Sequence, residues 1–550
     1  MNESYPETIL FVGAGATAAL SMPQTSKISE FLWDICDVED LTTHSVFGEI
    51  RFLDKKFNND VALMAYVLDS GYDGSKDIDF NDPFLKKAFP DVSSQAIIKT
   101  VSNLRKHYDW SALRLILKSK KGDSKGKLDG RDFTQEVFTL MDVCLRDERG
   151  FEVFHNGETI FLTVDRIKAA YETLILFINT MFAYAWNQLI TNAPNVLNRY
   201  SDFFYSLAKL MQEEAREKEN KGLKFNKPDF YRFSYSVVTT NFDPLFLWLI
   251  WKAHDRVNHR SDVRIGCPGR RLKLLMNFPN SLGMRKPKDE LNGLSADIWF
   301  PCSEAVAQNV NNPKYNDNRI FRLGMYYPVH GMSNTRKCPK CGRLNLYMGD
   351  SWEEKSKTLF PNGIINQFKW GQEPRTDKER NAHGCGEYDA LECHFCGQIT
   401  HSYDNFMFMQ TQLKRLPPSF IKETTDEALA AISHAKHIVL LGYSLPIDDA
   451  IWGSLLSMMT CRKTGDRVFC SVVATRDVNG PDKWLMGSEL DNYIKQKESQ
   501  DKEKVRAIKN AIIVFGKENV RAYVRGIPDV FHNGAIDDVK DLMYPQKGSY

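Results

Sequence analysis

The chain has 550 residues, of which 43% are hydrophobic, 12% aromatic and 26% charged, a composition typical of folded globular proteins. Its length allows one large hydrophobic core or roughly two to four smaller ones. The formal net charge of +2 excludes a strong overall basic field, so direct binding of nucleic acid is not indicated.

The predicted strands are short apolar runs that end in glycine or polar residues. In chain order they cover Thr8–Val12, Ser234–Thr240, Tyr327–Val329, His437–Leu441, Val468–Ala474 and Ala511–Phe515. Continuous apolar runs are typical of strands that are buried on both faces of a parallel sheet, and most of these runs are followed by helix-like or loop sequence. The sequence therefore predicts an α/β fold.

Helical periodicity dominates the long interval between the first two strands. Apolar residues recur there at i, i+3 and i+4 over Phe133–Arg146, Arg166–Ile190 and Ser201–Lys218. Residues 118–127 lack this periodicity and are expected to form a loop. The longest apolar stretch, at 174–190, is broken by polar residues and favours a buried helix over a membrane span. Because no signal peptide is visible, we expect a cytoplasmic protein without membrane contact.

A glycine-rich turn follows the first predicted strand, in residues 8–17, T-I-L-F-V-G-A-G-A-T. Gly13, Gly15 and Ala18 fit the pattern G-x-G-x-x-[G/A], whose glycines let backbone N–H groups approach a diphosphate. A dehydrogenase would also carry an acidic residue at the end of a second strand, about 20 residues further on. Residues 29–36, S-E-F-L-W-D-I-C, look helical instead, which disfavours a dehydrogenase. The turn alone also fits a plain strand-to-helix connection.

Polar side chains follow two later predicted strands. The segment V-V-T-T-N-F-D at 237–243 places Asn241 and Asp243 two residues apart at a strand end, where ligands bind in open α/β sheets. A local Asx turn is the alternative interpretation. The segment Y-P-V-H-G-M at 327–332 brings His330 to the same edge, where an imidazole can act as a base near neutral pH. A structural histidine is the alternative there.

Two pairs of cysteines have the spacing of metal ligands. The segments C-P-K-C and C-H-F-C supply Cys338, Cys341, Cys393 and Cys396. Two such pairs match a tetrahedral four-thiolate zinc site, which is structural because no coordination position stays open. The 51 residues between the pairs are many for a simple zinc ribbon, and His383 and Cys385 are competing ligands. The odd total of 11 cysteines also favours a reducing compartment over a disulfide framework.

A second glycine turn follows the strand at 437–441, within H-I-V-L-L-G-Y-S-L-P-I-D-D at 437–449. Gly442 and Ser444 in this turn are placed to reach a second phosphate or a ribose.

Taken in order, these motifs resemble the sirtuin family over nearly the whole chain, from Thr8 to about Asp529. Sirtuins carry a G-A-G turn, a T-Q-N-[IV]-D strand end, an H-G pair, a four-cysteine zinc module and a G-[TS]-S-L turn. The resemblance implies a Rossmann-like NAD domain joined to a small zinc-binding module and a helical module. It also implies cleavage of the bond between nicotinamide and ribose, with NAD⁺ as substrate and Zn²⁺ as a structural ion.

The resemblance assigns roles by motif position. Asn241 would position the ribose or a water, and His330 would contact the ribose hydroxyls and serve as base. The residues that it places at NAD⁺ are Gly13, Ala14, Gly15, Thr17, Asp243, Gly442 and Ser444. Among them the first glycine turn would line the diphosphate, Asp243 would hold the nicotinamide carboxamide, and the second glycine turn would lie by the adenosine half.

Departures from the family pattern bear on the acceptor. Protein-deacylating sirtuins follow the zinc module with a short F-G-E strand that pairs with the substrate peptide, whereas residues 406–414 here read F-M-F-M-Q-T-Q-L-K. The loop S-M-P-Q-T at 21–25 also lacks the usual acidic and aromatic pair. This pattern looks like the bacterial sirtuin-like effectors of anti-phage defence, which hydrolyse NAD⁺. A protein deacylase or ADP-ribosyltransferase and a non-catalytic NAD sensor are the alternatives.

The expected organisation interrupts a single NAD domain several times. Its parts are residues 1–44, a helical insertion at 45–230, the continued NAD domain at 231–335 with an insertion at 254–325, the zinc-binding module at 336–400, and the last part of the NAD domain at 401–550. A hydrolase that depletes NAD⁺ needs control, so we expect a homo-oligomer, with the helical insertion as its contact surface, or a partner protein such as a hexameric ATPase.

Overall fold

The structure is a computed structural model. It describes residues 5–38, 41, 64–65, 68–69, 107–122, 133–260, 262–278, 281–283, 303–314, 318–338, 340–346, 391–392, 396, 399–400, 404–407, 419–446, 450–460, 468–473 and 476–545.

One large sheet organises the described part of the chain. Its nine strands lie in the order β16 (Trp484–Leu485), β17 (Val520–Tyr523), β15 (Phe469–Val473), β14 (His437–Leu441), β1 (Thr8–Val12), β4 (Arg232–Thr239), β8 (Arg319–Pro328), β6 (Arg270–Asn277) and β5 (Arg264–Ile265). All neighbours are parallel except the two edge pairs, β16 with β17 and β5 with β6. The predicted α/β fold with a parallel sheet is therefore confirmed.

The strand order reverses next to β1. After β1 the chain places β4, β5, β6 and β8 on one side of it, and later returns to place β14 on the other side of β1. In open parallel sheets such a reversal opens a crevice at the carboxyl ends of the strands, where ligands bind.

Alternate residues of the central strands enter two separate cores. In β1, Leu10 and Val12 belong to one hydrophobic cluster, and Ile9 and Phe11 belong to the other. All four side chains are fully buried, as a strand covered on both faces requires.

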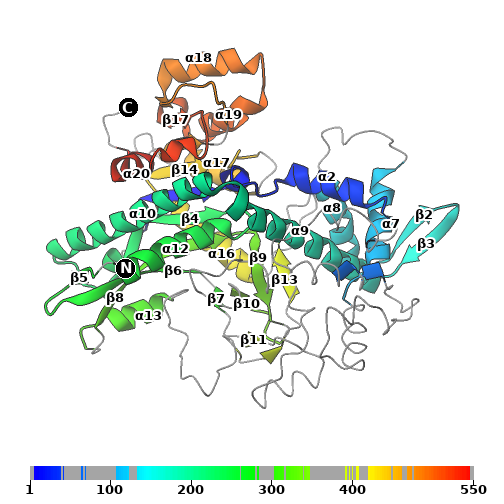
Figure 1. The fold of residues 1–550 in the computed structure, drawn as a ribbon, viewed down its shortest axis with the longest axis horizontal. Helices are drawn as coiled ribbons and strands as arrows, with labels where there is room; N and C mark the ends of the chain where they lie inside the picture. The colour runs from blue at the N-terminus through cyan, green and yellow to red at the C-terminus, as the bar shows by residue number, and fades with distance from the viewer. Residues whose placement is uncertain are drawn as a thin grey trace.

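Helices cover both faces of the sheet (Figure 1). The first core is closed by α10 (Pro194–Asn220), α12 (Leu245–Arg260) and α20 (Ile536–Met543), and the second by α16 (Ser419–His434), α17 (Ala450–Thr460) and α19 (Glu503–Phe515). The other described helices are α1 (Gly15–Ala18), α2 (Thr25–Ile35), α7 (Trp110–Lys121), α8 (Phe133–Arg146), α9 (Val164–Asn192), α11 (Pro228–Tyr231), α13 (Glu304–Asn311) and α18 (Gly487–Glu498).

Smaller sheets lie outside the main one. A four-stranded sheet has the order β13 (Asp404–Met407), β9 (Gly331–Lys337), β10 (Leu344–Leu346) and β7 (Ser281–Gly283). Two hairpins pair β2 (Phe151–His155) with β3 (Glu158–Leu162), and β11 (Leu391–Glu392) with β12 (Ile399–Thr400). The β2–β3 hairpin lies at one end of the molecule, beyond α7 and α8 (Figure 1).

Most predicted elements have the expected type. Strands β1 and β14 have the predicted bounds, and the predicted strands at 234–240 and 468–474 are β4 and β15. The run at 327–329 is the end of the longer β8. The three predicted helices are α8, α9 and α10. The expected insertion at 254–325 contributes β5, β6 and most of β8 to the main sheet.

Two predictions about elements were wrong. The run Ala511–Phe515 is not a strand but the end of helix α19. Its first and last residues are buried while Ile513 is 59% exposed, so only one face of the run is covered. The last parallel strand is β17 instead. The expected loop at 118–127 begins inside a helix, because α7 continues to Lys121.

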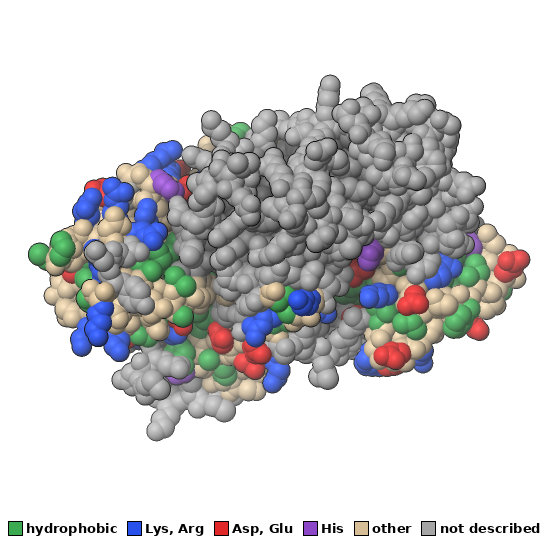
Figure 2. Space-filling view, turned by 90° about the horizontal axis from the view of Figure 1, so that it is seen from below, with side chains coloured by type: hydrophobic (Ala, Val, Ile, Leu, Met, Phe, Trp, Pro, Cys, Tyr) green, Lys and Arg blue, Asp and Glu red, His purple; other side chains and the backbone are tan. Residues whose placement is uncertain are grey.

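Figure 2 shows basic side chains gathered at one end of the molecule, the end where β5 lies in Figure 1. On the rest of the described surface in this view, acidic and basic side chains are mixed. In the β5–β6 ribbon, Arg264 and Arg271 both pair with Asp262, at 3.1 and 3.3 Å, which offsets part of the ribbon's positive charge. Among the described residues, no helix combines the length and apolar character needed to cross a bilayer.

Candidate functional site

Two glycine turns pack against each other where β1 and β14 end. The Gly13 N–H donates to the Leu441 carbonyl at 3.0 Å, and the Gly15 N–H donates to the Gly442 carbonyl at 2.9 Å. Gly442 has a φ of +61°, and a Cβ there would lie 1.8 Å from the Ala16 nitrogen. The two turns therefore approach so closely that a side chain at Gly442 has no room. The turn after β14 is held further by Asn510, whose amide donates to the carbonyls of Ser444 and Leu445.

The glycines mainly serve this backbone packing. A Cβ on Gly13 or on Gly15 would also lie under 3 Å from Gly442 atoms. Because both glycine N–H groups already donate to carbonyls, neither points to a ligand in this arrangement. Ala14 forms the exposed tip of the turn. Helix α1 has only four residues, so it provides little of a helix dipole.

Asn241 and Asp243 meet Thr17 at the end of β4. The Thr17 hydroxyl donates to Asp243 Oδ2 at 2.9 Å and lies 3.4 Å from Asn241 Nδ2. All three residues are buried, with exposed fractions of 1%, 4% and 4% for Thr17, Asn241 and Asp243. Three of the predicted site residues, from two adjacent strand ends, thus form one hydrogen-bonded group.

Asp243 also forms the local Asx turn that was the alternative interpretation. The Leu245 N–H donates to its Oδ1 at 3.2 Å, at the start of α12. Burial raises the pKa of Asp243 from 3.8 to about 6, although the hydrogen bonds from Thr17 and Leu245 act in the opposite direction. A carboxylate has about four acceptor positions, so these two donors leave room for a ligand donor.

The Oδ1 atom of Asn241 is buried and has no hydrogen-bond partner among the described residues. The Asn241 backbone N–H donates to Thr239 Oγ1 at 3.0 Å, which fixes the backbone from which the Asn241 side chain extends. A buried acceptor without a donor destabilises a fold by about 1–3 kcal/mol, so such an atom calls for an explanation. A water or a ligand hydroxyl would satisfy it.

His330 reaches the same edge from the next strand. It follows β8, and it is buried with an exposed fraction of 8%. Its ring lies 6.1 Å from the ring of Phe242, centre to centre, with 25° between the planes. Phe242 stands between Asn241 and Asp243, and its carbonyl accepts from the Ser333 N–H at 2.7 Å. The loop after β4 is therefore joined to β9, the strand that starts directly after His330.

Tyr200 is a residue of this region that the sequence did not reveal. It lies on α10, is fully buried, and donates its hydroxyl to the Ala16 carbonyl at 2.7 Å. Burial raises its pKa well above the usual value, so the hydroxyl keeps its proton. A tyrosine on the apolar stripe of a helix reads as an ordinary core residue, and no motif connects it to a turn 184 positions away.

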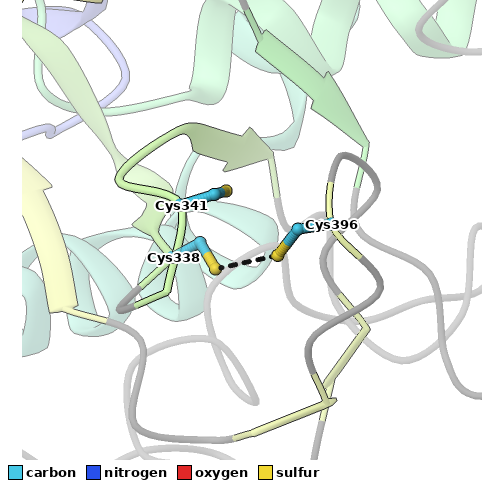
Figure 3. A group of neighbouring side chains, drawn as sticks. All are labelled: Cys338, Cys341 and Cys396. Carbon is cyan, nitrogen blue, oxygen red and sulfur yellow. Dashed lines mark hydrogen bonds between the residues drawn. The ribbon is translucent and has the colours of Figure 1, made fainter.

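Three cysteines form a candidate metal centre (Figure 3). Cys338 and Cys341 lie between β9 and β10, and Cys396 lies between β11 and β12. Their sulfur atoms all lie within 4.8 Å of one another, and those of Cys338 and Cys396 are 3.7 Å apart. Tetrahedral zinc with Zn–S bonds of about 2.3 Å places two sulfurs about 3.8 Å apart, so the spacing of Cys338 and Cys396 fits zinc.

The first cysteine pair forms a tight turn around the centre. The Gly342 N–H donates to the Cys338 carbonyl at 2.9 Å, and the Cys338 N–H donates to the Arg343 carbonyl at 3.0 Å. Gly342 has a φ of +71°, which favours glycine there. The predicted fourth ligand, Cys393, and the alternatives His383 and Cys385 lie outside the described residues.

Comparison with models of known protein families gives no match, and no curated protein is significantly similar to the chain.

The packed turns predict a strong effect of Gly442→Ala. The new methyl group would overlap the backbone of Gly15 and Ala16, and the positive φ disfavours alanine by about 1 kcal/mol in addition. We expect a thermal unfolding midpoint several degrees lower, or insoluble protein. Gly453→Ala is the matched control, because nothing lies within 4 Å of its Cβ position in α17 and alanine favours helix. Equal midpoints for the two variants would refute the close packing.

Asp243→Asn should remove a pH-dependent destabilisation. Because the native pKa of Asp243 is raised, the native state binds the proton more tightly than the unfolded chain, and stability falls as pH rises from about 4 through 6. The shift corresponds to roughly 3 kcal/mol at pH 8. We therefore expect Asp243→Asn to raise the unfolding midpoint relative to wild type at pH 8 more than at pH 5. A change that is the same at both pH values would contradict the buried carboxylate.

Metal content tests the cysteine centre. Purified protein should contain about one equivalent of zinc by elemental mass spectrometry, and Cys338→Ser and Cys396→Ser should each lose most of it. Cys267→Ser is the control, since Cys267 is an exposed free cysteine that is not part of the group. Zinc retained by both ligand variants would rule out this centre.

Proposed function

We propose that the chain is an NAD⁺ hydrolase that cleaves the nicotinamide–ribose bond and releases ADP-ribose and nicotinamide. The observation that carries the proposal is the buried Oδ1 of Asn241, which has no partner in the part of the chain that the structure describes and is held beside Asp243 where the strand order reverses. His330 lies at the end of the neighbouring strand. The sirtuin-like order of motifs supplies the choice of NAD⁺, and the proposal includes a Rossmann-like character of the main sheet.

The proposed reaction is a substitution at the ribose carbon C1′. Departure of nicotinamide gives this carbon oxocarbenium character, and the oxygen of a water forms a bond to it as the bond to nicotinamide nitrogen breaks. The water gives up one proton, to His330 as base and then to solvent. Asn241 Oδ1 would accept a hydrogen bond from that water or from a ribose hydroxyl. The Asp243 carboxylate would accept from the nicotinamide carboxamide N–H₂.

The cysteine centre has no part in this chemistry. Zinc, when bound by Cys338, Cys341, Cys393 and Cys396, would tie together the two hairpins that carry them. Four thiolate ligands would leave no position for substrate, so the role that we propose for the ion is structural.

A non-catalytic role has one specific observation in its favour. The N–H groups of Gly13 and Gly15 are used within the packed turns, as in a purely architectural connection. Under the hydrolase proposal, the diphosphate would contact the exposed Ala14 end of the turn instead. The role as a regulated anti-phage effector, with a homo-oligomer or a partner ATPase, is part of the proposal and rests on the sequence resemblance alone.

The proposal is tested by incubating purified protein with NAD⁺ and measuring nicotinamide and ADP-ribose by chromatography. Asn241→Ala and His330→Ala should each lower the turnover rate by about 10²-fold or more, a common effect of removing an acid–base or positioning group. Asn220→Ala and His434→Ala, at exposed ends of α10 and α16, are controls expected to match wild type.

The outcomes separate the candidate functions. Turnover that survives both site variants would place the chemistry elsewhere. NAD⁺ binding without turnover would favour the sensor. Turnover that requires an acetylated peptide would favour the deacylase. Protein that neither binds nor cleaves NAD⁺ contradicts the proposal.

A further inference from the structure

Thr17 is placed to control the two polar side chains that follow β4. It lies two residues after Gly15 and is almost fully buried, with an exposed fraction of 1%. Its hydroxyl contacts Asp243 Oδ2 at 2.9 Å and Asn241 Nδ2 at 3.4 Å. The hydroxyl is therefore occupied by protein groups on both its donor and its acceptor side.

The direction of these hydrogen bonds follows from the chemistry of the groups. The Thr17 hydroxyl has two acceptors, Asp243 Oδ2 at 2.9 Å and the Ala14 carbonyl at 3.5 Å. An ionised carboxylate only accepts hydrogen bonds and is both the nearer and the stronger acceptor, so the single hydroxyl proton goes to Asp243. The oxygen of Thr17 can then only accept from Asn241, and the Asn241 amide must present its N–H₂ group to Thr17. The amide oxygen consequently points away from Thr17, and this is the buried atom that has no partner among the described residues.

We infer that Thr17 is a positioning residue that fixes the amide orientation of Asn241, so that Oδ1 is the atom offered to the attacking water or to a ribose hydroxyl. This inference rests on the proposed function. It assigns Thr17 no direct contact with a phosphate of NAD⁺, because its hydroxyl has no hydrogen left to donate. Without the hydroxyl, the amide could rotate by 180° and present its N–H₂ group, which cannot accept a hydrogen from water.

The first test compares Thr17→Val with Thr17→Ser in the NAD⁺ assay. Valine keeps the shape of threonine and removes the hydroxyl, whereas serine keeps the hydroxyl. Thr17→Val should lower kcat by about 10-fold or more with KM for NAD⁺ within about 3-fold, and Thr17→Ser should stay within about 3-fold of wild type in both. In an Asn241→Ala background, Thr17→Val should cause no further loss of kcat, because Thr17 acts through Asn241.

A second readout does not depend on turnover. Loss of the donor to an ionised carboxylate should lower the unfolding midpoint of Thr17→Val below that of Thr17→Ser by more degrees at pH 8 than at pH 5. In an Asp243→Asn background this dependence on pH should vanish. Tyr200 on α10, Tyr326 on β8 and His330 are further titratable groups that face or adjoin this region. Both proteins of each compared pair contain them, so their titration does not change the difference that is measured.

The outcomes distinguish this inference from the proposed function. If the wild type cleaves NAD⁺ and Thr17→Val and Thr17→Ser cleave it at equal rates, the inference about Thr17 is overturned while the proposed function stands. Losses of kcat that multiply in the double variant, or a rise in KM without a fall in kcat, would overturn it in favour of a direct NAD⁺ contact. Wild-type protein that neither binds nor cleaves NAD⁺ overturns the proposed function and the role that rests on it. The stability comparison then still decides whether the Thr17–Asp243 hydrogen bond exists.

Discussion

The candidate site depends on the close approach of two backbone turns at the ends of β1 and β14. The carbonyl of Gly442 accepts from the Gly15 N–H, and the absent side chain of Gly442 leaves the space that the Ala16 backbone fills. This packing sets the path of the chain after Gly15. It thereby sets where Thr17 lies relative to the end of β4. Tyr200 holds the same turn through the hydrogen bond that it donates to the Ala16 carbonyl.

Next to these turns lie two buried polar side chains, those of Asp243 and Asn241, that lower the stability of the folded state. Burial raises the pKa of Asp243 to about 6, so keeping it ionised at neutral pH lowers the stability of the native state despite its two hydrogen bonds. The neighbouring Asn241 Oδ1 is buried, and no described residue donates a hydrogen bond to it. Buried polar groups that lack part of their hydrogen bonding are frequent at functional sites, because a bound ligand can supply the missing hydrogen bonds. The two features together argue for a ligand that brings a hydroxyl or a water.

The sequence predicts the central strands well and the site in part. Runs such as Thr8–Val12 and His437–Leu441 are buried on both faces of the sheet, so nearly every residue in them is apolar and the strand can be recognised from the sequence. Ala511–Phe515 is equally apolar, but a run of five such residues also fits the end of a buried helix, which α19 proves to be. The sequence placed Asn241 and His330 at one edge of the sheet because parallel strands end there, and the structure has them at the ends of β4 and β8. The hydrogen bond from Tyr200 to Ala16 and the one from Thr17 to Asp243 join segments that are far apart in the sequence, and patterns of neighbouring residues do not predict such contacts.

The most direct test of the account is a crystal structure of the His330→Ala protein with NAD⁺ bound. We expect the diphosphate at Ala14 and the turn of Gly442, and the nicotinamide ribose within hydrogen-bond distance, directly or through one water, of Asn241 Oδ1. We also expect an unbroken hydrogen bond between Thr17 and Asp243. NAD⁺ bound away from the ends of β1, β4 and β14, or a Thr17 hydroxyl turned to a phosphate, would contradict the account.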